Sequence, residues 1–257
     1  MRTDVDIDAL LALATTIALE AGGLLAERLR TAAELVETKS TITDMVTQVD
    51  RDSEALLVGR ILAERPDDAV LGEEGGERAG TSGVRWVLDP LDGTTNYLYG
   101  YPAFAVSVGV EVDGELCVGV VHDAARDETF AAAHGRGATV AGRPASVSDK
   151  TDLATALVGT GFSYSRDDRT RQAATLTRVL PRVRDVRRAG AAALDLCWVG
   201  CGRLDGFYER GLQPWDLAAG SVIVREAGGR TTRLDDGTVV AAGPGLFDPL
   251  VSLVAGP

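Results

Sequence analysis

The hydrophobic positions of the first thirty residues repeat with helical spacing. The recurring apolar side chains are Ile7, Leu10, Leu11, Ala14, Ile17, Ala18 and Ala21. This spacing predicts an amphipathic surface helix. Aspartates precede the apolar run and charged residues interrupt it, so it lacks the basic start of a signal peptide, and no apolar stretch looks long enough to span a bilayer.

Segment 34–50 follows, and we expect a short strand, a flexible turn and an extended piece there. Helical periodicity then resumes, with Thr47 as the expected N-cap and Pro66 as the stop.

The pattern changes to strands after residue 66. Short apolar runs at 69–72 and 84–88 each end in acidic residues. Residues 104–133 alternate or run apolar around a turn at Asp113-Gly114, which predicts antiparallel hairpins. From about residue 154, strand and helix patterns alternate as in a layered α/β half. We therefore expect an N-terminal α+β half (1–147) and a C-terminal α/β half (148–257) that form one compact unit.

Composition narrows the class of protein. The chain has 257 residues, 45% of them hydrophobic, enough for a sizeable core. Three cysteines (Cys117, Cys197 and Cys201) and two histidines are too few for a disulfide framework or a zinc cluster, and they favour a cytoplasmic location. A net charge of −12 disfavours binding to nucleic acid or to an anionic membrane. An acidic protein can still bind a phosphorylated substrate if cations intervene.

Acidic residues stand at the ends of several predicted elements. They are Glu73 and Glu74 in GEEGG, Asp89 and Asp92 in DPLDGTTN, and Asp216 in PWDLAAG. Each group alone could be a solvated turn or a helix cap. Together they predict one cleft at the strand ends, where so many negative charges would repel each other unless metal ions neutralised them. Oxygen ligands without nearby histidine or cysteine favour magnesium, with manganese as a substitute, over zinc.

The stretch DPLDGTTN also predicts a phosphate site. Pro90 fixes the backbone after Asp89, and Gly93 allows the chain to pass close to a ligand. Residues 94–96 are expected to begin a helical turn whose free N–H groups hold phosphate. Metal ions on one side and amide donors on the other define a phosphoryl site.

Other phosphatase chemistries fit the residues poorly. Phosphoaspartyl enzymes need aspartates at i and i+2, whereas Asp89 and Asp92 are at i and i+3. Cys197 and Arg203 have the C-x5-R spacing of a cysteine phosphatase, but Leu196 precedes the cysteine where a histidine would activate it, so helix packing is the better interpretation.

His122 and His134 have no serine partner at recognisable spacing, and we expect both at the surface or in turns. With no obvious protein nucleophile, the expected nucleophile is a metal-bound water.

Four motifs together resemble the inositol monophosphatase family of magnesium-dependent, lithium-sensitive phosphatases, in its bacterial form. They are GEE (72–74), WVLDPLDGTTNY (86–97), RRAGAAALDLCWVGCGRLDGFYERG (187–211) and PWDLAAGSVIVREAGG (214–229). They occur in the family's order and cover nearly the whole chain. The resemblance implies a layered αβαβα sandwich of the inositol monophosphatase and fructose-bisphosphatase type, commonly a homodimer.

The resemblance also implies residue roles. The implied magnesium ligands are Glu73, Asp89, the carbonyl of Leu91, Asp92, Asp216 and, for a third and weaker site, Asp50. Glu73, Thr94 and Asp92 form the implied catalytic set, in which Glu73 and Thr94 orient the attacking water. The implied substrate contacts are Asp92, Gly93, Thr94, Ala192, Glu209 and Asp216, and Lys39 matches a loop lysine near the metals. One ion would activate water and a second would stabilise the leaving oxygen.

The substrate is left open between several phosphate esters. Myo-inositol 1-phosphate or a related polyol phosphate comes first, because Glu209 matches a position that contacts inositol hydroxyls. Histidinol phosphate, fructose 1,6-bisphosphate and 3′-phosphoadenosine 5′-phosphate are the alternatives, since the metal site is indifferent to the alcohol. A protein-binding role in transcription or ribosome assembly is the alternative from another class.

Overall fold

The computed structural model describes residues 5–34 and 42–256 of the chain. Its helices are α1 (Ile7–Glu34), α2 (Ile42–Glu64), α3 (Thr94–Leu98), α4 (Arg166–Val179), α5 (Ala192–Gly200), α6 (Pro214–Glu226) and α7 (Pro244–Ala255). Its first strands are β1 (Ala69–Gly72), β2 (Gly76–Arg78), β3 (Val84–Asp92), β4 (Ala105–Val112), β5 (Glu115–Asp123), β6 (Glu128–Ala133), β7 (Gly137–Val140) and β8 (Arg143–Ala145). The later strands are β9 (Leu157–Thr160), β10 (Asp185–Arg187), β11 (Gly206–Arg210), β12 (Arg230–Arg233) and β13 (Thr238–Ala242).

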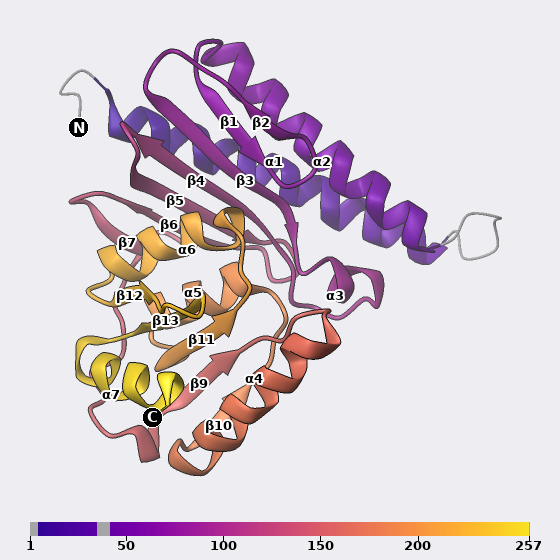
Figure 1. The fold of residues 1–257 in the computed structure, drawn as a ribbon. Coiled ribbons are helices and arrows are strands. Elements are labelled where there is room, and N and C mark those ends of the chain that lie inside the picture. Colours follow the sequence, from indigo (N-terminus) through magenta and orange to yellow (C-terminus); the bar gives the residue numbers. More distant parts are fainter. Residues whose placement is uncertain (1–4, 35–41, 257) are drawn as a thin grey trace.

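Two sheets and three helix layers alternate (Figure 1). The larger sheet has the strand order β2-β1-β3-β4-β5-β6-β7-β8, and the smaller has the order β10-β9-β11-β13-β12. Helices α1 and α2 cover the outer face of the larger sheet, α5 and α6 lie between the sheets, and α7 packs on β13 and β11 on the far side. The predicted layered αβαβα sandwich is confirmed. Residues 104–133 form the predicted antiparallel hairpins.

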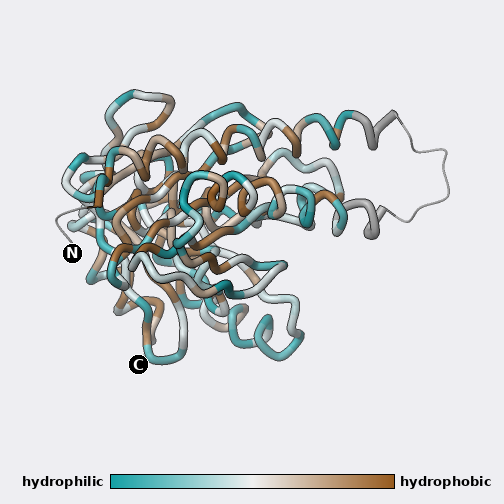
Figure 2. Tube along the Cα trace, turned by 90° about the horizontal axis from the view of Figure 1, so that it is seen from above, coloured by the Kyte–Doolittle hydropathy of each residue, from teal (hydrophilic) through white to brown (hydrophobic). Residues whose placement is uncertain are grey.

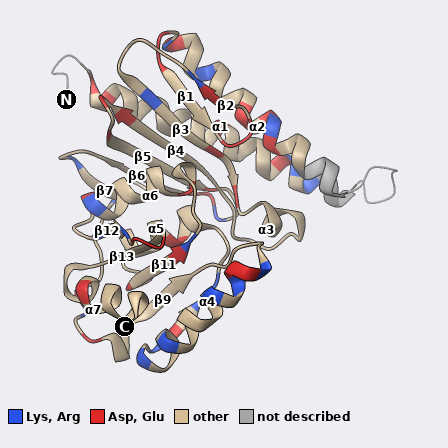
Figure 3. Cartoon of the chain, viewed as in Figure 1, with Lys and Arg blue, Asp and Glu red and all other residues tan. Residues whose placement is uncertain are grey.

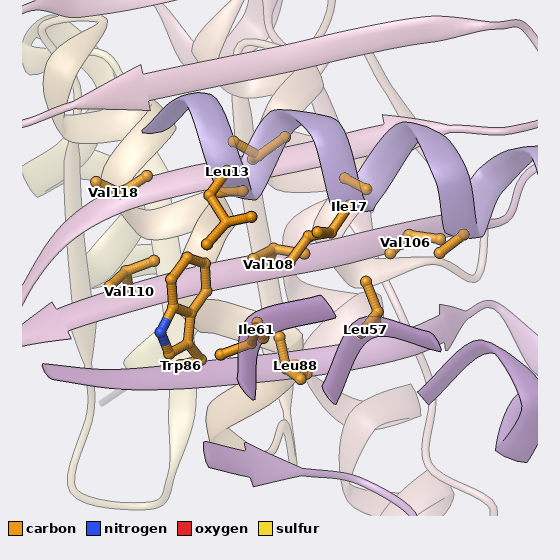
Figure 4. Packing of buried hydrophobic residues seen from close by; sticks show 14 of the residues in the cluster. Leu13, Ile17, Leu57, Ile61, Trp86, Leu88, Val106, Val108, Val110 and Val118 are labelled. Carbon is orange, nitrogen blue, oxygen red and sulfur yellow. The ribbon is translucent and has the colours of Figure 1, made fainter. Parts of the chain in front are cut away.

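The first core lies between the α1–α2 layer and the larger sheet. Figure 4 shows side chains of both helices pointing onto strands β3, β4 and β5. The largest member, Trp86, is fully buried, and its Nε1–H donates a 2.9 Å hydrogen bond to Asp68. A buried indole needs such a partner because an unpaired donor would lose its bond to water. Figure 2 shows hydrophobic segments gathered inside the molecule and hydrophilic ones toward its edges.

Helix α1 corrects one expectation. Its segment Ile7–Arg30 has 24 residues and a mean hydropathy of 1.8, so by length and composition it could cross a membrane. The expectation that no stretch is long enough was therefore wrong. In the fold, however, one face of α1 packs on the larger sheet, and Leu10, Ile17 and Leu25 are buried in the first core. This explains the apolar composition without a membrane.

Helix α2 corrects a second expectation. We expected an extended piece up to residue 50 and an N-cap at Thr47, but residues 42–64 are one helix. The burial of Val49, Leu57 and Ile61 against the sheet outweighs the weak local helical signal of the segment before residue 47. Asp50 therefore stands on a helix. Lys39 and residues 35–41 around it lie outside the described part of the chain.

Helix α6 approaches the larger sheet at two paired glycines. Gly109 of β4 lies opposite Gly119 of β5, and both face Ala218 and Ala219 of α6. A Cβ on Gly119 would lie 2.3 Å from the carbonyl oxygen of Ala219. The two glycines therefore let α6 lie close to the strands, and the first turn of α6 carries Asp216.

Helix α4 lies on the outside of the second half (Figure 3). Acidic residues occupy its first turn and Arg178 its last turn, which suits the helix dipole. The larger sheet ends at residue 145 and the smaller begins at 157. The division into halves at 147/148 stays a prediction.

Candidate active site

Strand β3 brings Asp89 and Asp92 to the same side through a bulge. Asp89 pairs with Ser107 and Asp92 with Ala105, so β3 has one residue more than β4 in this interval. In a regular strand, side chains at i and i+3 point to opposite faces, and the extra residue cancels that alternation. Both aspartates are buried. The i, i+3 spacing of Asp89 and Asp92 in the sequence therefore corresponds to the bulge in β3.

The turn after β1 places Glu73 beside this pair. Strand β1 runs parallel to β3, with Gly72 opposite Leu88, so Glu73 leaves its strand next to Asp89. Buried Glu54 of α2 holds the turn by accepting N–H bonds from Glu74 (2.9 Å) and Gly75 (2.6 Å).

Glu54 was not predicted from the sequence. It stands inside a helix, and nothing in its neighbours in the chain indicates that it supports a turn twenty residues later.

Helix α6 supplies the acid from the second half. Asp216 lies in its first turn, and its Oδ2 accepts the N–H of Gln213 at 2.6 Å in a capping box. The helix-cap interpretation was therefore correct, and it is compatible with a place in the site, because the cap uses one carboxylate oxygen and Asp216 also lines the cavity.

Burial and mutual repulsion disturb the titration of these carboxyl groups. Burial, followed by the charges of Asp216 and Glu74, raises the pKa of Glu73 to about 7. Burial and Asp216 raise the pKa of Asp92 to about 7, although the amides of Ala192 and Ala193 act in the opposite direction. Burial and neighbouring acids also raise the pKa of Asp89 well above its ordinary value. A cation at this position would relieve the repulsion.

Asp50 does not line the cavity. It is buried, its Oδ1 has no hydrogen-bond partner within the described ranges, and burial together with Glu73, Glu74 and Glu54 raises its pKa to about 8. A buried carboxylate oxygen without a donor is costly, so the position suits a cation. Residues 5–34 and 42–256 contain no group of three histidine, cysteine or acidic side chains already arranged to hold a metal ion.

The start of α3 forms the glycine turn and the helix start that the sequence predicts for residues 93–96. Gly93 is the N-cap with φ of +89°, and a Cβ there would lie 2.7 Å from the carbonyl oxygen of Ala103. No larger residue fits without strain. Thr94 Oγ donates to the carbonyl of Leu91 at 3.1 Å. Asn96 fixes the segment by donating to Ala103 (2.7 Å) and to Ala189 (2.9 Å).

A cavity of about 220 Å³ unites the predicted residues. Its walls include Glu73, Asp89, Leu91, Asp92, Gly93, Thr94, Ala192, Glu209 and Asp216, which is every predicted site residue except Asp50. Residues that we did not predict complete the wall: Phe162, Tyr164, Arg188, Gly190, Arg210, Gly211 and Leu212, together with Ser163, which we had left unassigned.

The residues next to Tyr164 in the sequence give no sign that it lines the cavity, because its contact with the site is made with a residue far away in the chain. Its hydroxyl lies 2.6 Å from Thr95 Oγ.

Glu209 lines the cavity from the second half of the chain. It belongs to β11, and burial, then Asp92 and Asp216, raises its pKa to about 8, while Arg188 acts in the opposite direction. Gly161 makes room for it, since a Cβ there would lie 2.0 Å from Glu209 Oε2.

Cys197 and the two histidines, the candidates for a cysteine phosphatase or a Ser-His-Asp triad, do not have the surroundings that these chemistries need. Cys197 is fully buried in α5, and burial raises the pKa of its thiol well above the ordinary value, so it cannot serve as a thiolate nucleophile. His134 is in a turn as expected, but the expectation for His122 was wrong. His122 is buried on β5, where its Nδ1 lies 3.0 Å from Thr129 Oγ and its ring fills the space left by Gly22.

The layered fold and its acidic cavity indicate a class of phosphatases, and similarity to known proteins gives the family. The chain belongs to the inositol monophosphatase family, whose model matches residues 6–255. "Inositol-1-monophosphatase SuhB" of Mycobacterium tuberculosis is 49% identical over 232 residues, 84% of this chain and 80% of that protein. "Nus factor SuhB" of Pasteurella multocida is 38% identical over 257 residues, 95% of each chain. The inositol monophosphatase structure from Anabaena superposes with a TM-score of 0.88 at 37% identity, covering 98% of this chain and 97% of that one.

Proposed function

We propose that this protein is a magnesium-dependent phosphomonoesterase that hydrolyses myo-inositol 1-phosphate, or a related polyol phosphate, to the free alcohol and phosphate. The observation that carries the proposal is the single cavity in which the bulge of β3, the turn after β1 and the first turn of α6 bring their carboxylates beside the amides of Gly93 and Thr94. The acids would repel a phosphate ester on their own, so the proposal requires cations between them and the substrate.

The donor set fits hard cations. Glu73, Asp89, the carbonyl of Leu91, Asp92 and Asp216 would hold two magnesium ions, and Asp50 would help to hold a third. Manganese would substitute, since it prefers the same oxygen ligands. When bound, the ions would lower the pKa of a water molecule and offset charge on the phosphate.

The protein's own groups would position the reactants. The N–H groups of Gly93 and Thr94 would bind phosphate oxygens, and Glu73 with Thr94 Oγ would orient the attacking water. Asp92 is itself held by the N–H groups of Ala192 (3.2 Å) and Ala193 (2.7 Å) at the start of α5. These two bonds fix the carboxylate before substrate arrives, so little of the binding free energy is lost in ordering it.

Glu209 favours a polyol substrate. Its carboxylate would accept hydrogen bonds from hydroxyl groups, and Ala192 would leave space for the ring. Histidinol phosphate, fructose 1,6-bisphosphate and 3′-phosphoadenosine 5′-phosphate are the alternative substrates. The three free cysteines fit the cytoplasm, and we propose a homodimer that makes no direct contact with nucleic acid or membrane.

Phosphate release from these four esters, with and without magnesium and lithium, tests the proposal. We expect myo-inositol 1-phosphate to give the highest kcat/KM, lithium to inhibit, and Asp89→Asn to abolish turnover. Failure to hydrolyse any ester with magnesium or manganese would contradict the proposal.

The relatives named Nus factor favour a second candidate function, a protein-binding role in transcription or ribosome assembly. This role needs the surface and not the cations, so Asp89→Asn should preserve it while removing phosphatase activity.

A further inference from the structure

Tyr164 joins the two halves of the chain at the rim of the cavity. It stands in the loop between β9 and α4 and lines the cavity, and its hydroxyl lies 2.6 Å from Thr95 Oγ of α3. Figure 1 shows α3 beside the start of α4. Tyr164 is 80% exposed and Thr95 is exposed as well, so the contact is made at the surface and not in a core. The proposed function gives this contact no role.

The two partners of this hydrogen bond continue opposite walls of the cavity. Thr95 directly follows Thr94, and Tyr164 directly follows Ser163, and both of these preceding residues line the cavity. The bond therefore ties a wall from the first half of the chain to a wall from the second half. If it breaks, the opening between the two walls can widen.

The loop that carries Tyr164 has a fixed base and a weakly held tip. At the base, buried Gln172 of α4 accepts the N–H of Ser163 (2.9 Å) and donates to the carbonyl of Arg210 at the end of β11 (3.1 Å). At the tip, the bonds are exposed, as is the 3.3 Å bond from Arg169 to the carbonyl of Tyr164. Exposed hydrogen bonds compete with water and open at little cost. The tip can therefore swing while the base stays in place.

The cavity is small with this bond in place. Its volume is about 220 Å³, whereas pockets for drug-sized ligands typically have about 300–1,000 Å³. A single polyol ring with one phosphate is a small ligand, but an adenosine with two phosphates is of drug size. The larger ester would extend beyond the walls, and the bond between Thr95 and Tyr164 closes one way out.

We propose that Tyr164 is a specificity-determining residue, whose hydrogen bond to Thr95 keeps the opening of the cavity narrow and so favours esters of small alcohols. A large ester binds the open form alone, so the free energy of the bond lowers its apparent affinity. A small ester binds with the bond intact. The inference rests on the proposed function, because it assigns the size limit on the alcohol at the same site.

Two esters of different size test the inference. We compare kcat/KM for myo-inositol 1-phosphate and for 3′-phosphoadenosine 5′-phosphate in the wild type, Tyr164→Phe and Thr95→Val. Each variant removes one hydroxyl group of the bond and keeps the bulk of the side chain. We expect the ratio of kcat/KM, adenosine ester over inositol ester, to rise about two- to tenfold in each variant. The double variant should rise no further than either single one, because both lose the same bond.

Tyr99→Phe is the matched control. Tyr99 ends α3 and is also 80% exposed, but it does not line the cavity. We expect this variant to keep the wild-type ratio for the two esters. The comparison separates the bond to Thr95 from the general effect of removing an exposed phenol hydroxyl near α3.

Amide hydrogen exchange gives a readout that does not depend on turnover. The N–H of Ser165 donates to Ser163 Oγ at 3.0 Å in the tip of the loop. Its exchange, followed by NMR, should become about two- to tenfold faster in Tyr164→Phe and Thr95→Val, and should stay at the wild-type rate in Tyr99→Phe.

Four results would overturn the inference: an unchanged exchange rate, an unchanged ratio for the two esters, an equal loss for both esters in Tyr164→Phe, or additive effects in the double variant. If the wild type hydrolyses neither ester with magnesium or manganese, the proposed function fails. The exchange rates still decide, in that case, whether the bond to Thr95 restrains the loop of Tyr164.

Discussion

Gly119→Ala should displace Asp216, one of the proposed metal ligands, without touching the cavity. The added methyl group would lie 2.3 Å from the carbonyl oxygen of Ala219, and real Cβ atoms essentially never come closer than 3.0 Å to such an atom. Helix α6 must therefore move by at least 0.7 Å, or the strand must. Overpacking of this kind costs about 1–3 kcal/mol, which corresponds to roughly 2–12 °C in Tm for a chain of this size.

The functional consequence follows from the position of Asp216. It lies less than one turn from Ala219 on the same helix, so a rigid shift of α6 carries its carboxylate with it. A misplacement near 1 Å in an active site can cost on the order of 100-fold in rate. We expect kcat for phosphate release to fall between about 10-fold and 100-fold, with a weaker stabilisation by magnesium, since Asp216 is one of the proposed ligands.

The assay compares thermal unfolding and phosphate release for Gly119→Ala with the same measurements for Gly59→Ala. Gly59 lies on an exposed part of α2, and a Cβ there meets nothing within 4 Å. That control should gain up to about 1 kcal/mol from helix propensity and keep full activity. Wild-type Tm and kcat in Gly119→Ala would refute the argument that the paired glycines set the position of α6.

Three further outcomes can be measured. The pKa values of Glu73 and Asp50 are raised to about 7 and about 8, so without metal their contribution to stability is present at low pH and is lost as pH rises through those values. Magnesium should therefore raise Tm more at pH 8 than at pH 6. An equal shift at the two pH values would contradict this. Burial lowers the pKa of His122, so its contribution to stability is complete above about pH 6.5 and falls at lower pH. Between pH 7 and pH 5, the free energy of unfolding should therefore fall less in His122→Asn than in the wild type, as urea titrations would show. Cys197→Ala should retain kcat and lose stability by roughly 1 kcal/mol, because a small cavity replaces the thiol; loss of kcat in a folded variant would restore the cysteine mechanism.

Much of the site could be predicted because its chemistry is local in the chain. DPLDGTTN contains three of the proposed magnesium ligands, a glycine with positive φ and the start of α3 within eight residues, and the structure keeps the turn and the helix start in this order. The strands and hairpins from 69 to 133 follow from their apolar runs and turn signals, since β3, β4 and β5 are buried on both faces between two helix layers.

The errors have identifiable physical causes. Residues 42–46 were predicted to be extended because their local helix propensity is weak. They are helical because α2 packs on β3. His122 looked like a turn residue because no sequence pattern shows that Gly22, a hundred residues away, leaves a space for its ring. A buried polar residue on a strand is unusual, and a single sequence gives no sign of its partner.

The sequence by itself determined which residue types carry the chemistry: hard oxygen ligands, a glycine turn and a helix start, in an order that the inositol monophosphatase family shares. Only the tertiary structure decided how they meet. The bulge of β3 aims two aspartates to one side, Glu54 holds the turn of Glu73, and two glycines allow α6 to bring Asp216 into place. These relations depend on contacts between residues far apart in the chain, which are set by packing and not by any local preference of the backbone.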